Sequence, residues 1–433
     1  MIARPDLLDA RSPAGIEVFQ LTDDPALPSC HVYMEAQIFT PDSRRFVLHR
    51  SAHAHGSDKN DPRHVYQLCE VNSGALAPLT VETGATGPSV SPDGQYLYYF
   101  VNETHVNGGR LTLKRVRLDG AERETILVVD APLPDITALT PKPKQGYRPS
   151  FIYPLSTLSS DGERIIISGF LGDGSYAAAP WGMMVFDIPR ASVALAHYGP
   201  SWQNLHPQYC RSRDPEASHD VLIQENHENF IDAQGHELIS HGGLGADIHV
   251  IRDDGTNFRN MPWGRDGNEF CQGHQCWIGR GTRAITTTMT VNPSEWQLIA
   301  GRAVPSTWHV GRHSPGGMRT DLSRTFTDPH FWHFATDIAG MHFITDASEQ
   351  DQRGCLYAAR IPADEEAPLY DFTYLINPHN SLDGPTHMHP FLSPDGAPAH
   401  MHPFLSPDGA TGFFNSDESG TLQAYMIRGL DRL

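Results

Sequence analysis

The sequence predicts an all-β protein, a seven-bladed β-propeller closed by an N-terminal strand that joins the C-terminal blade. Three observations lead to this fold class. A unit made of an extended segment, a Pro-Asp-Gly turn or a degenerate form of it, and a second apolar strand recurs seven times. Successive turns are roughly fifty to seventy residues apart, the spacing of four-stranded blades with variable loops. Glycine and proline are abundant, at 38 and 34 residues, and no long stretch has helical periodicity, so helices should be few and short.

The turns define the blades one by one. Clear units occupy residues 38–48, 90–100 and 158–167, each with an Asp at the turn before a β-rich strand. Weaker units occupy residues 209–223, 277–286 and 336–344, and the last unit occupies residues 405–414. Seven units predict seven blades, and we expect residues 1–433 to form a single propeller domain. An irregular pair of β-sandwiches with coincidental turns is the alternative interpretation.

The two ends of the chain are expected to share a blade. Residues 15–21 have the composition of a strand and precede the first unit, whereas the inner strands of the last blade come from residues near 400–428. Pairing between these segments would close the ring. Closure removes exposed sheet edges and stabilises the fold without disulfides.

Charge and composition limit the partners and the compartment. The formal net charge of -19 argues against a nucleic-acid partner, because phosphate neutralisation needs concentrated Lys and Arg. No stretch reaches membrane-spanning length, and residues 1–15 lack the apolar run of a signal peptide, so we expect no membrane partner and a cytoplasmic location. The six cysteines are scattered, which fits a reducing compartment, and Cys271 and Cys276 are expected to be small buried residues in strands. The oligomeric state is left open.

Histidine is the residue type that indicates chemistry. The chain has 24 histidines, and several lie where the predicted inner strands begin. Inner strands line the centre of a propeller, so histidines far apart in sequence can become neighbours there. The segment His-Met-His-Pro-Phe-Leu-Ser-Pro-Asp-Gly-Ala occurs twice and supplies two His-x-His pairs, His387 with His389 and His400 with His402. Residues i and i+2 of a strand face the same side, so either pair could hold one metal ion. A polar surface strand is the alternative.

Other histidines enter the remaining inner strands. His333 precedes the sixth turn and could add a third metal ligand from the neighbouring blade. His274 is not spaced to join the His-x-His pair, which suits a neutral general base with a pKa near the operating pH. The fourth unit supplies four further candidate residues, His206 and Tyr209 with Asp247 and His249 on a following strand. Each single histidine could instead be an ordinary hydrogen-bonded core or surface residue.

These segments, taken in order, resemble the oligogalacturonate lyases of polysaccharide lyase family 22. The order of the motifs along nearly the whole chain carries the resemblance, more than any one of them. The matching segments are Ser29-Cys30-His31, His206-Pro207-x-Tyr209, Asp253-Asp254-Gly255-Thr256-Asn257-Phe258-Arg259, His274-x-x-Trp277, His333 to Gly340, Thr-His-x-His-Pro before the last turn, and Asn415-Ser416-Asp417 after it.

The resemblance implies a metal-assisted enzyme that cleaves short uronate oligosaccharides by β-elimination. It implies a divalent ion, of the manganese type, held by three histidines and a Gln. His333 and one of the two His-Met-His copies then become ligands, His274 becomes the base, and His206, Tyr209, Asp247 and His249 become substrate-binding residues. The family Gln falls at Gly384 or Ala397, and the family Arg two positions before His249 falls at Asp247.

Two alternatives stay open. Asp247 in place of the Arg favours a lyase for a different uronate-containing oligosaccharide. A noncatalytic propeller of the TolB or WD type is the second, because one fold hosts many functions.

Between the two His-Met-His copies, we favour His400 and His402 as ligands, because residues 400–414 run without interruption through the last turn into its partner strand. The first copy is followed by Pro398, which would interrupt that strand.

Overall fold

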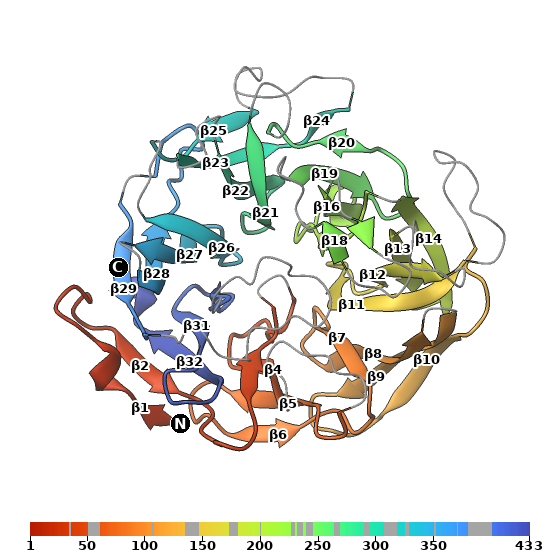
Figure 1. The fold of residues 1–433 in the computed structure, drawn as a ribbon, viewed down its shortest axis with the longest axis horizontal. Helices are drawn as coiled ribbons and strands as arrows, with labels where there is room; N and C mark the ends of the chain where they lie inside the picture. The colour runs from red at the N-terminus through yellow and green to blue at the C-terminus, as the bar shows by residue number, and fades with distance from the viewer. Residues whose placement is uncertain are drawn as a thin grey trace.

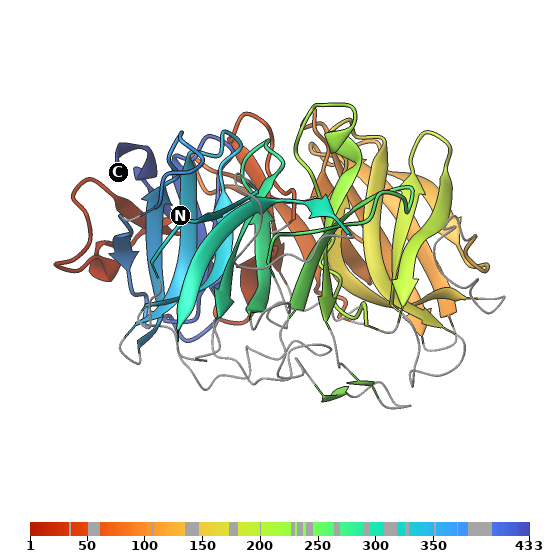
Figure 2. The ribbon, with the colours of Figure 1, turned by 90° about the horizontal axis from the view of Figure 1, so that it is seen from above.

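The computed structural model describes a closed ring of β-sheets. Figure 1 shows the sheets arranged around a central axis, and the side view in Figure 2 shows their strands running along that axis. The described residues are 1–33, 36–50, 61–105, 108–134, 147–172, 181–199, 201–226, 230–231, 237–239, 246–263, 269–289, 295–306, 318–324, 329–349, 352–369, 371–379 and 401–433. The ring has seven blades, which confirms the predicted fold class.

The first three blades are regular four-stranded antiparallel sheets. In each of them the strands follow one another from the centre outward in sequence order. The first blade contains β3 (Ser29–His31), β4 (Arg45–Arg50), β5 (Val65–Glu70) and β6 (Leu76–Pro78). The second contains β7 (Ala85–Val90), β8 (Tyr96–His105), β9 (Gly108–Arg117) and β10 (Glu124–Val129). The third contains β11 (Arg148–Leu158), β12 (Arg164–Gly172), β13 (Trp181–Asp187) and β14 (Ser192–Gly199).

The fourth and fifth blades are joined into one sheet by a single bridge between Ala246 and Cys271. The fourth contains β15 (Gln208–Tyr209), β16 (Asp220–Asn226), β19 (Ala246–Arg252) and β20 (Arg259–Asn260), and β20 pairs with β24 (Val304–Pro305). The fifth contains β21 (Phe270–Trp277), β22 (Arg283–Met289), β23 (Trp296–Arg302) and β25 (Arg319–Asp321). A separate two-stranded sheet is formed by β17 (Phe230–Ile231) and β18 (Glu237–Ile239).

The last two blades complete the ring. The sixth contains β26 (His330–Thr336), β27 (His342–Glu349), β28 (Gln352–Arg360) and β29 (Thr373–Ile376). The seventh contains β30 (Phe404–Leu405), β31 (Thr411–Ser416) and β32 (Gln423–Arg428), followed outward by β2 (Glu17–Gln20) and β1 (Ile2–Ala3). The antiparallel pairing of β2 with β32 confirms the predicted closure by the N-terminal strand. Helical structure in the described residues is limited to short 3-10 turns at Pro5–Leu7, Ala217–His219 and Leu430–Arg432.

The turns that follow the inner strands of four blades share one hydrogen-bond pattern. In the second blade the Ser91 hydroxyl donates to the Asp93 carboxylate (2.5 Å) and accepts from the Tyr96 amide (2.9 Å). Gly94 follows with a φ of 70°, in the left-handed region that glycine adopts without strain. Equivalent bonds form in three other blades, between Thr40 and Asp42, Ser159 and Asp161, and Ser406 and Asp408.

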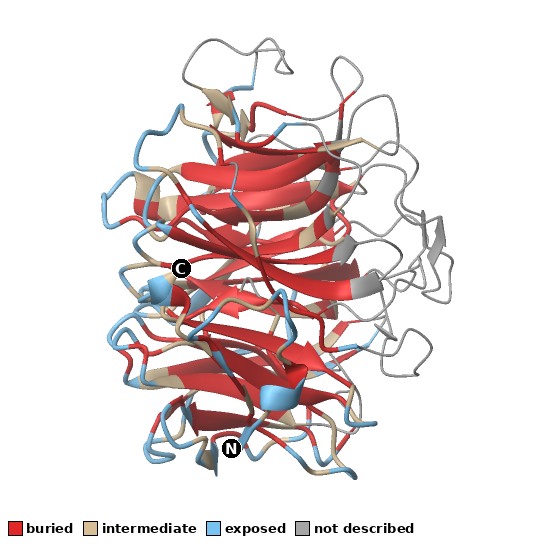
Figure 3. Ribbon diagram, turned by 90° about the vertical axis from the view of Figure 1, so that its left-hand side faces the viewer, coloured by how far each residue is buried: buried red, intermediate tan, exposed pale blue. Residues whose placement is uncertain are grey.

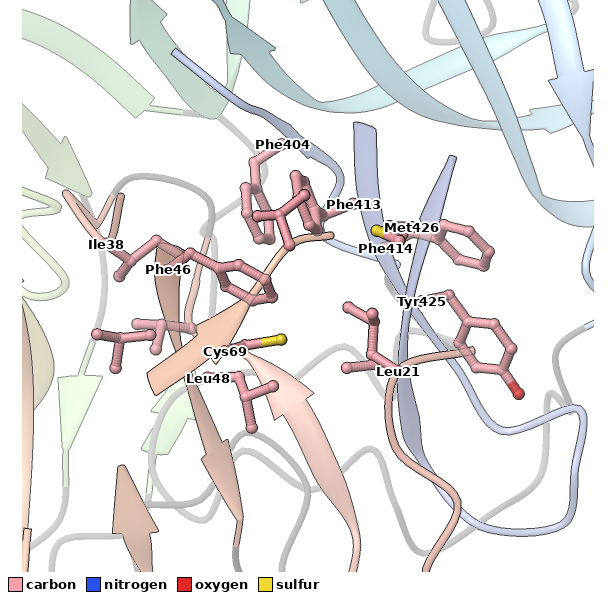
Figure 4. Packing of buried hydrophobic residues seen from close by; sticks show 14 of the residues in the cluster. Leu21, Ile38, Phe46, Leu48, Cys69, Phe404, Phe413, Phe414, Tyr425 and Met426 are labelled. Atoms are coloured by element: carbon pink, nitrogen blue, oxygen red, sulfur yellow. The ribbon is translucent and has the colours of Figure 1, made fainter. Parts of the chain in front are cut away.

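The core lies within and between the blades. Figure 3 shows the strands as mostly buried, with exposed residues concentrated in the described loops. The cluster between the first and seventh blades is drawn in Figure 4, where Phe46 packs beside Phe413 and Phe404. The stacked rings of Phe404 and Phe413 have centroids 5.1 Å apart. All six cysteines are buried, as predicted for Cys271 and Cys276, and none forms a disulfide. Among the described residues, no helix is long and apolar enough to span a membrane.

Candidate active site

Four histidines from four different blades gather where the inner strands begin. The ring centroids of His274, from β21, and His333, from β26, lie 4.2 Å apart. The ring centroid of His402, just before β30, lies 4.6 Å from that of His333. Tyr33, which follows β3, connects the group: its ring lies 4.6 Å from His402 and 5.4 Å from His206. The ring architecture therefore brings residues 33, 206, 274, 333 and 402 together, and we call this group the histidine cluster.

Asp346 fixes the orientation of His333. Its carboxylate lies 3.0 Å from His333 Nδ1 and accepts the backbone N–H of His333 at 2.8 Å. The same carboxylate accepts the backbone N–H of Met401 at 3.2 Å, so it also positions the segment that carries His402. All of these groups are buried. Histidine ligands of metal ions are commonly oriented by a carboxylate on the other ring nitrogen. With Nδ1 bound to Asp346, Nε2 is the ring nitrogen of His333 that could serve as a ligand.

His206 and His402 both have left-handed backbones, with a φ of 44° in each case. Such a conformation is uncommon for a residue other than glycine, and strained residues of this kind cluster at functional sites. Both side chains are buried. His206 Nε2 lies 3.1 Å from the Tyr153 hydroxyl, which places a phenol from the third blade beside the histidine of the fourth. The chain therefore holds these two imidazoles in place against an intrinsic backbone preference.

His274 is the half-buried histidine of the histidine cluster. Its backbone carbonyl accepts the Thr286 hydroxyl at 2.6 Å, which holds β21 against β22. The preceding Gly273 has a φ of 92°, and a Cβ there would lie 2.9 Å from the Gln224 amide, so this bend suits glycine. The bend lies within a register shift of the β21–β22 ladder. His274 is thus presented at the mouth of the inner strand, beside His333.

The donor set for a metal ion is incomplete in the part of the chain that the structure describes. No group of three or more His, Cys, Asp or Glu side chains in those residues is arranged to hold an ion. His387, His389 and His400 lie outside the described residues. His333 has the orientation of a metal ligand and His402 lies beside it, so the described residues offer two candidate ligands.

The other predicted substrate residues take different positions. Tyr209 is buried, and its hydroxyl donates to Asp253 at 2.9 Å, while burial raises the pKa of Tyr209 well above 10. His249 lies on the third strand of its blade, with Nδ1 2.9 Å from the Asn260 side chain and Nε2 3.4 Å from the Glu225 carboxylate. Asp247 faces Glu225 in the β16–β19 register. The structure therefore brings His206 into the histidine cluster and places Tyr209 in the core of the fourth blade.

Sequence reasoning missed three residues of this site: Tyr33, Tyr153 and Asp346. One signal could have found Asp346, which interrupts the apolar run Phe343-Ile344-Thr345-Asp346-Ala347 of a predicted strand. A carboxylate buried in such a strand needs a partner. Tyr33 and Tyr153 carry no comparable signal, because each reaches the histidines only through the closed ring.

The fold and the histidine cluster define a seven-bladed propeller with imidazoles gathered at one end of its inner strands. No protein-family model matches the chain, and no curated protein matches its sequence. Solved structures do match. An oligogalacturonate lyase from Vibrio parahaemolyticus aligns with a TM-score of 0.65 and 17% identity, covering 96% of this chain and 95% of that one.

A second oligogalacturonate lyase, solved in complex with manganese, aligns with a TM-score of 0.66 and 18% identity, covering 97% of this chain and 94% of that one. Prolyl endopeptidase structures also match, with a TM-score of 0.52 and 10% identity over 94% of this chain, but only 51% of that chain is covered. At these identities the likeness shows a shared fold. The resemblance predicted from the motifs thus agrees with the fold of the two lyases.

Proposed function

We propose that this protein is a metal-assisted lyase that cleaves short uronate oligosaccharides by β-elimination and releases a 4,5-unsaturated uronate. The observation that carries the proposal is the histidine cluster, in which His274 lies beside a carboxylate-oriented His333 and His402. The fold shared with two oligogalacturonate lyases, one of them in complex with manganese, supports it. The substrate class is a small anionic oligosaccharide, and the proposed compartment is the cytoplasm.

The chemistry requires a base and a means of masking negative charge. The C5 proton of a uronate is α to a carboxylate and is too weak an acid for an imidazole alone. A divalent ion, manganese in the first instance, supplies positive charge toward the substrate carboxylate when bound. His333 would hold it together with one His-Met-His copy, either His400 with His402 or the alternative pair His387 with His389.

His274 acts as the general base in this proposal. Its imidazole takes the C5 proton, the electron pair of the C5–H bond forms the C4=C5 double bond, and the C4–O bond breaks. The departing glycosidic oxygen keeps the electron pair of the broken C4–O bond and is then protonated. No nucleophilic residue or pair of carboxylic acids is needed, unlike in glycoside hydrolysis. His274 suits the role because it is half-buried at the mouth of the site and its ring adjoins His333.

One observation favours the alternative of a different uronate-containing substrate. Asp247, where the resembling family has an Arg, lies opposite Glu225 on the neighbouring strand. Two carboxylates at this place repel an anionic sugar ring, so a uronate here would be bound in another way or replaced by a neutral unit. A noncatalytic scaffold is the second alternative, and bound metal would argue against it.

The test is to follow the ultraviolet absorbance of the conjugated unsaturated uronate. Purified protein is stripped with a chelator, reloaded with manganese, magnesium, calcium or zinc, and mixed with oligomers of galacturonate, glucuronate and rhamnose-uronate units. We expect absorbance to rise with one uronate class in the presence of one or more ions. Bound metal without any new absorbance would contradict the lyase proposal, and protein that neither binds metal nor reacts would favour the scaffold.

A further inference from the structure

A cavity lies at the opposite ends of the inner strands, away from the histidine cluster. It has a volume of about 210 Å³ and is lined at or near the ends of four inner strands by Val90, Leu158, Ala335 and Leu405, and by Ile38 of the first blade. Three arginines also line it: Arg211, Arg213 and Arg280. We call it the arginine cavity. None of its residues belongs to the histidine cluster.

The charge of this cavity opposes that of the whole protein. The chain has a formal net charge of -19, yet no Asp or Glu is among the described residues that line the cavity. Arg213 and Arg280 are exposed, and Arg211 is half-buried. In the part of the chain that the structure describes, none of the three guanidinium groups has a carboxylate within ion-pair distance. Three arginines without counter-ions therefore face one hollow.

The nearby turn carboxylates do not neutralise these arginines. Ser91 and Ser159 line the cavity, and the aspartates next to them are engaged in their own turns. Asp93 accepts the Ser91 hydroxyl at 2.5 Å and the Gln95 amide at 3.0 Å, and Asp161 accepts the Ser159 hydroxyl at 2.5 Å. Neither Asp93 nor Asp161 forms an ion pair with the three arginines. Asp337 forms none either: it accepts the backbone N–H groups of Met341 and His342, and its charge raises the pKa of Arg211 less than burial lowers it.

Arg211 is held at the cavity by the surrounding blades. Its Nη1 donates to the backbone carbonyl of Thr336 at 3.1 Å. The Thr336 hydroxyl in turn donates to the Trp277 carbonyl at 2.8 Å and accepts the Gly279 amide at 3.0 Å. Burial lowers the pKa of Arg211, since its charge is partly desolvated. A desolvated charge without a counter-ion is unfavourable, and an incoming anion would relieve that penalty.

We propose that the arginine cavity binds a small oxyanion, a carboxylate or phosphate group on a compact molecule with an apolar part. Guanidinium groups match the geometry of both anions through paired hydrogen bonds. Phe39, Ile338 and Phe404 supply apolar walls next to the arginines. The cavity is smaller than the roughly 300 Å³ at which drug-sized pockets begin, which favours a ligand with few atoms. This site is independent of the proposed lyase activity.

The experiment uses three probes that share a ring and differ in charge. Benzoate carries a carboxylate, phenyl phosphate carries a phosphate, and benzamide is neutral. Calorimetric titration of the full chain at low ionic strength should show binding of at least one anion and none of benzamide. The anion that binds more tightly shows whether the ligand of this cavity carries a carboxylate or a phosphate. Equal binding of benzamide would overturn the proposal, because the cavity would then act as an apolar pocket.

Variants locate the bound anion. Arg280→Gln changes an exposed side chain and should leave folding intact, and Arg211→Gln removes the half-buried charge. Each should weaken anion binding by about tenfold or more, the effect of losing one charge-assisted hydrogen bond.

Arg324→Gln, at an exposed arginine that does not line the cavity, is the matched control and should bind as the unaltered protein does. His333→Ala should also leave binding unchanged. Loss of binding in His333→Ala with normal binding in Arg280→Gln would overturn the proposal and place the anion at the histidine cluster.

Discussion

A single carboxylate organises much of the histidine cluster. Asp346 binds the ring and the backbone N–H of His333 and also accepts the N–H of Met401 from the next blade. A change of this residue would therefore act on two blades at once. The two imidazoles beside His333 differ in their surroundings: His402 is held in a left-handed backbone within the core, whereas His274 is half-buried at the mouth. In the proposed mechanism, His402 is a metal ligand and His274 is the base.

The first prediction uses that contrast. His274→Ala should reduce elimination by at least about 10²-fold, the lower range for a general base, while metal content stays unchanged. His333→Ala should lower metal content and activity together, and added manganese should partly restore activity. Metal content is measured by elemental analysis and turnover by ultraviolet absorbance. Near-normal turnover in His274→Ala would remove this residue from the mechanism, and full metal content in His333→Ala would place the ion elsewhere.

The second prediction concerns His31, which is buried among Phe46, Phe404 and Phe413. Burial lowers its pKa from 6.5 to about 3. Between these two pH values His31 is protonated in the unfolded chain and neutral in the folded protein. The free energy of unfolding therefore decreases as the pH falls through this range. The slope for one such group is about 1.4 kcal/mol per pH unit.

We therefore expect His31→Gln to flatten the decrease in unfolding free energy between about pH 6.5 and pH 4. Denaturant titrations at several pH values measure it. Carboxylates lose stabilising interactions over part of the same range in both proteins, so the difference between the two slopes isolates His31. His105→Gln, at an exposed histidine, is the control and should keep the original slope. Equal slopes in all three proteins would contradict the assignment.

For single residues, the sequence indicated which side chains gather in the histidine cluster better than it indicated which residues contact them. His206, His274, His333 and His402 could be singled out, because imidazoles at the starts of inner strands converge in any closed ring. Tyr33 could not be, since its contacts with His206 and His402 both join residues that are more than a hundred positions apart in the sequence. Tyr209 is also singled out by a motif, but that motif does not predict the hydrogen bond that its hydroxyl donates to Asp253.

The turns are the elements that sequence predicts best. A Ser or Thr two residues before Asp satisfies local backbone N–H groups wherever the pattern occurs, as at Ser91 with Asp93 and Ser406 with Asp408. The number and spacing of blades follow from these local bonds. The weaker units lack the full pattern, and the bridge that joins β19 to β21 could not be predicted, because it depends on how two blades meet.

The third prediction separates backbone strain from contact between blades. Gly94 has a φ of 70°, and a Cβ there would lie 2.8 Å from the Pro41 ring of the preceding blade. Gly120 has a φ of 83° with nothing within 4 Å of that position. Gly120→Ala should cost roughly 1–2 kcal/mol from backbone strain alone. Gly94→Ala should cost roughly 1–3 kcal/mol more from overpacking. Denaturant midpoints measure both losses, and equal losses would show that the contact with Pro41 adds no overpacking cost.

The fourth prediction concerns the duplicated segment. His402, from the second His-Met-His copy, lies beside His333, whereas the first copy lies outside the described residues. Deleting residues 387–399 joins Thr386 to His400 and leaves one Thr-His-Met-His unit. The shortened protein should fold, bind metal and retain its activity. A folded, metal-bound but inactive deletion variant would mean that both copies contribute to function.

On the scale of the whole molecule, the ring is closed by backbone pairing between chain ends more than four hundred residues apart. β2 pairs with β32 over four residues, from Glu17 opposite Arg428 to Gln20 opposite Tyr425. Arg4 adds an ion pair with Glu418 at 2.5 Å. The sequence predicted this closure because residues 15–21 form a strand without a partner of their own. The outward continuation to β1 could not be predicted from a segment as short as Ile2–Ala3.

The last prediction tests this closure. Ile16, Val18 and Leu21 are buried against the last blade, and burial of one such side chain contributes roughly 1.5–3 kcal/mol. Deleting residues 1–21 removes all three and exposes the edge of β32, which can then pair with another chain. We expect a lower unfolding temperature and concentration-dependent aggregation, measured by calorimetry and light scattering. A synthetic peptide of residues 1–21 should raise the unfolding temperature again, because it restores the missing strand, whereas the same peptide with Val18→Asp should not. An unchanged unfolding temperature after the deletion would show that the seven blades hold together without this strand.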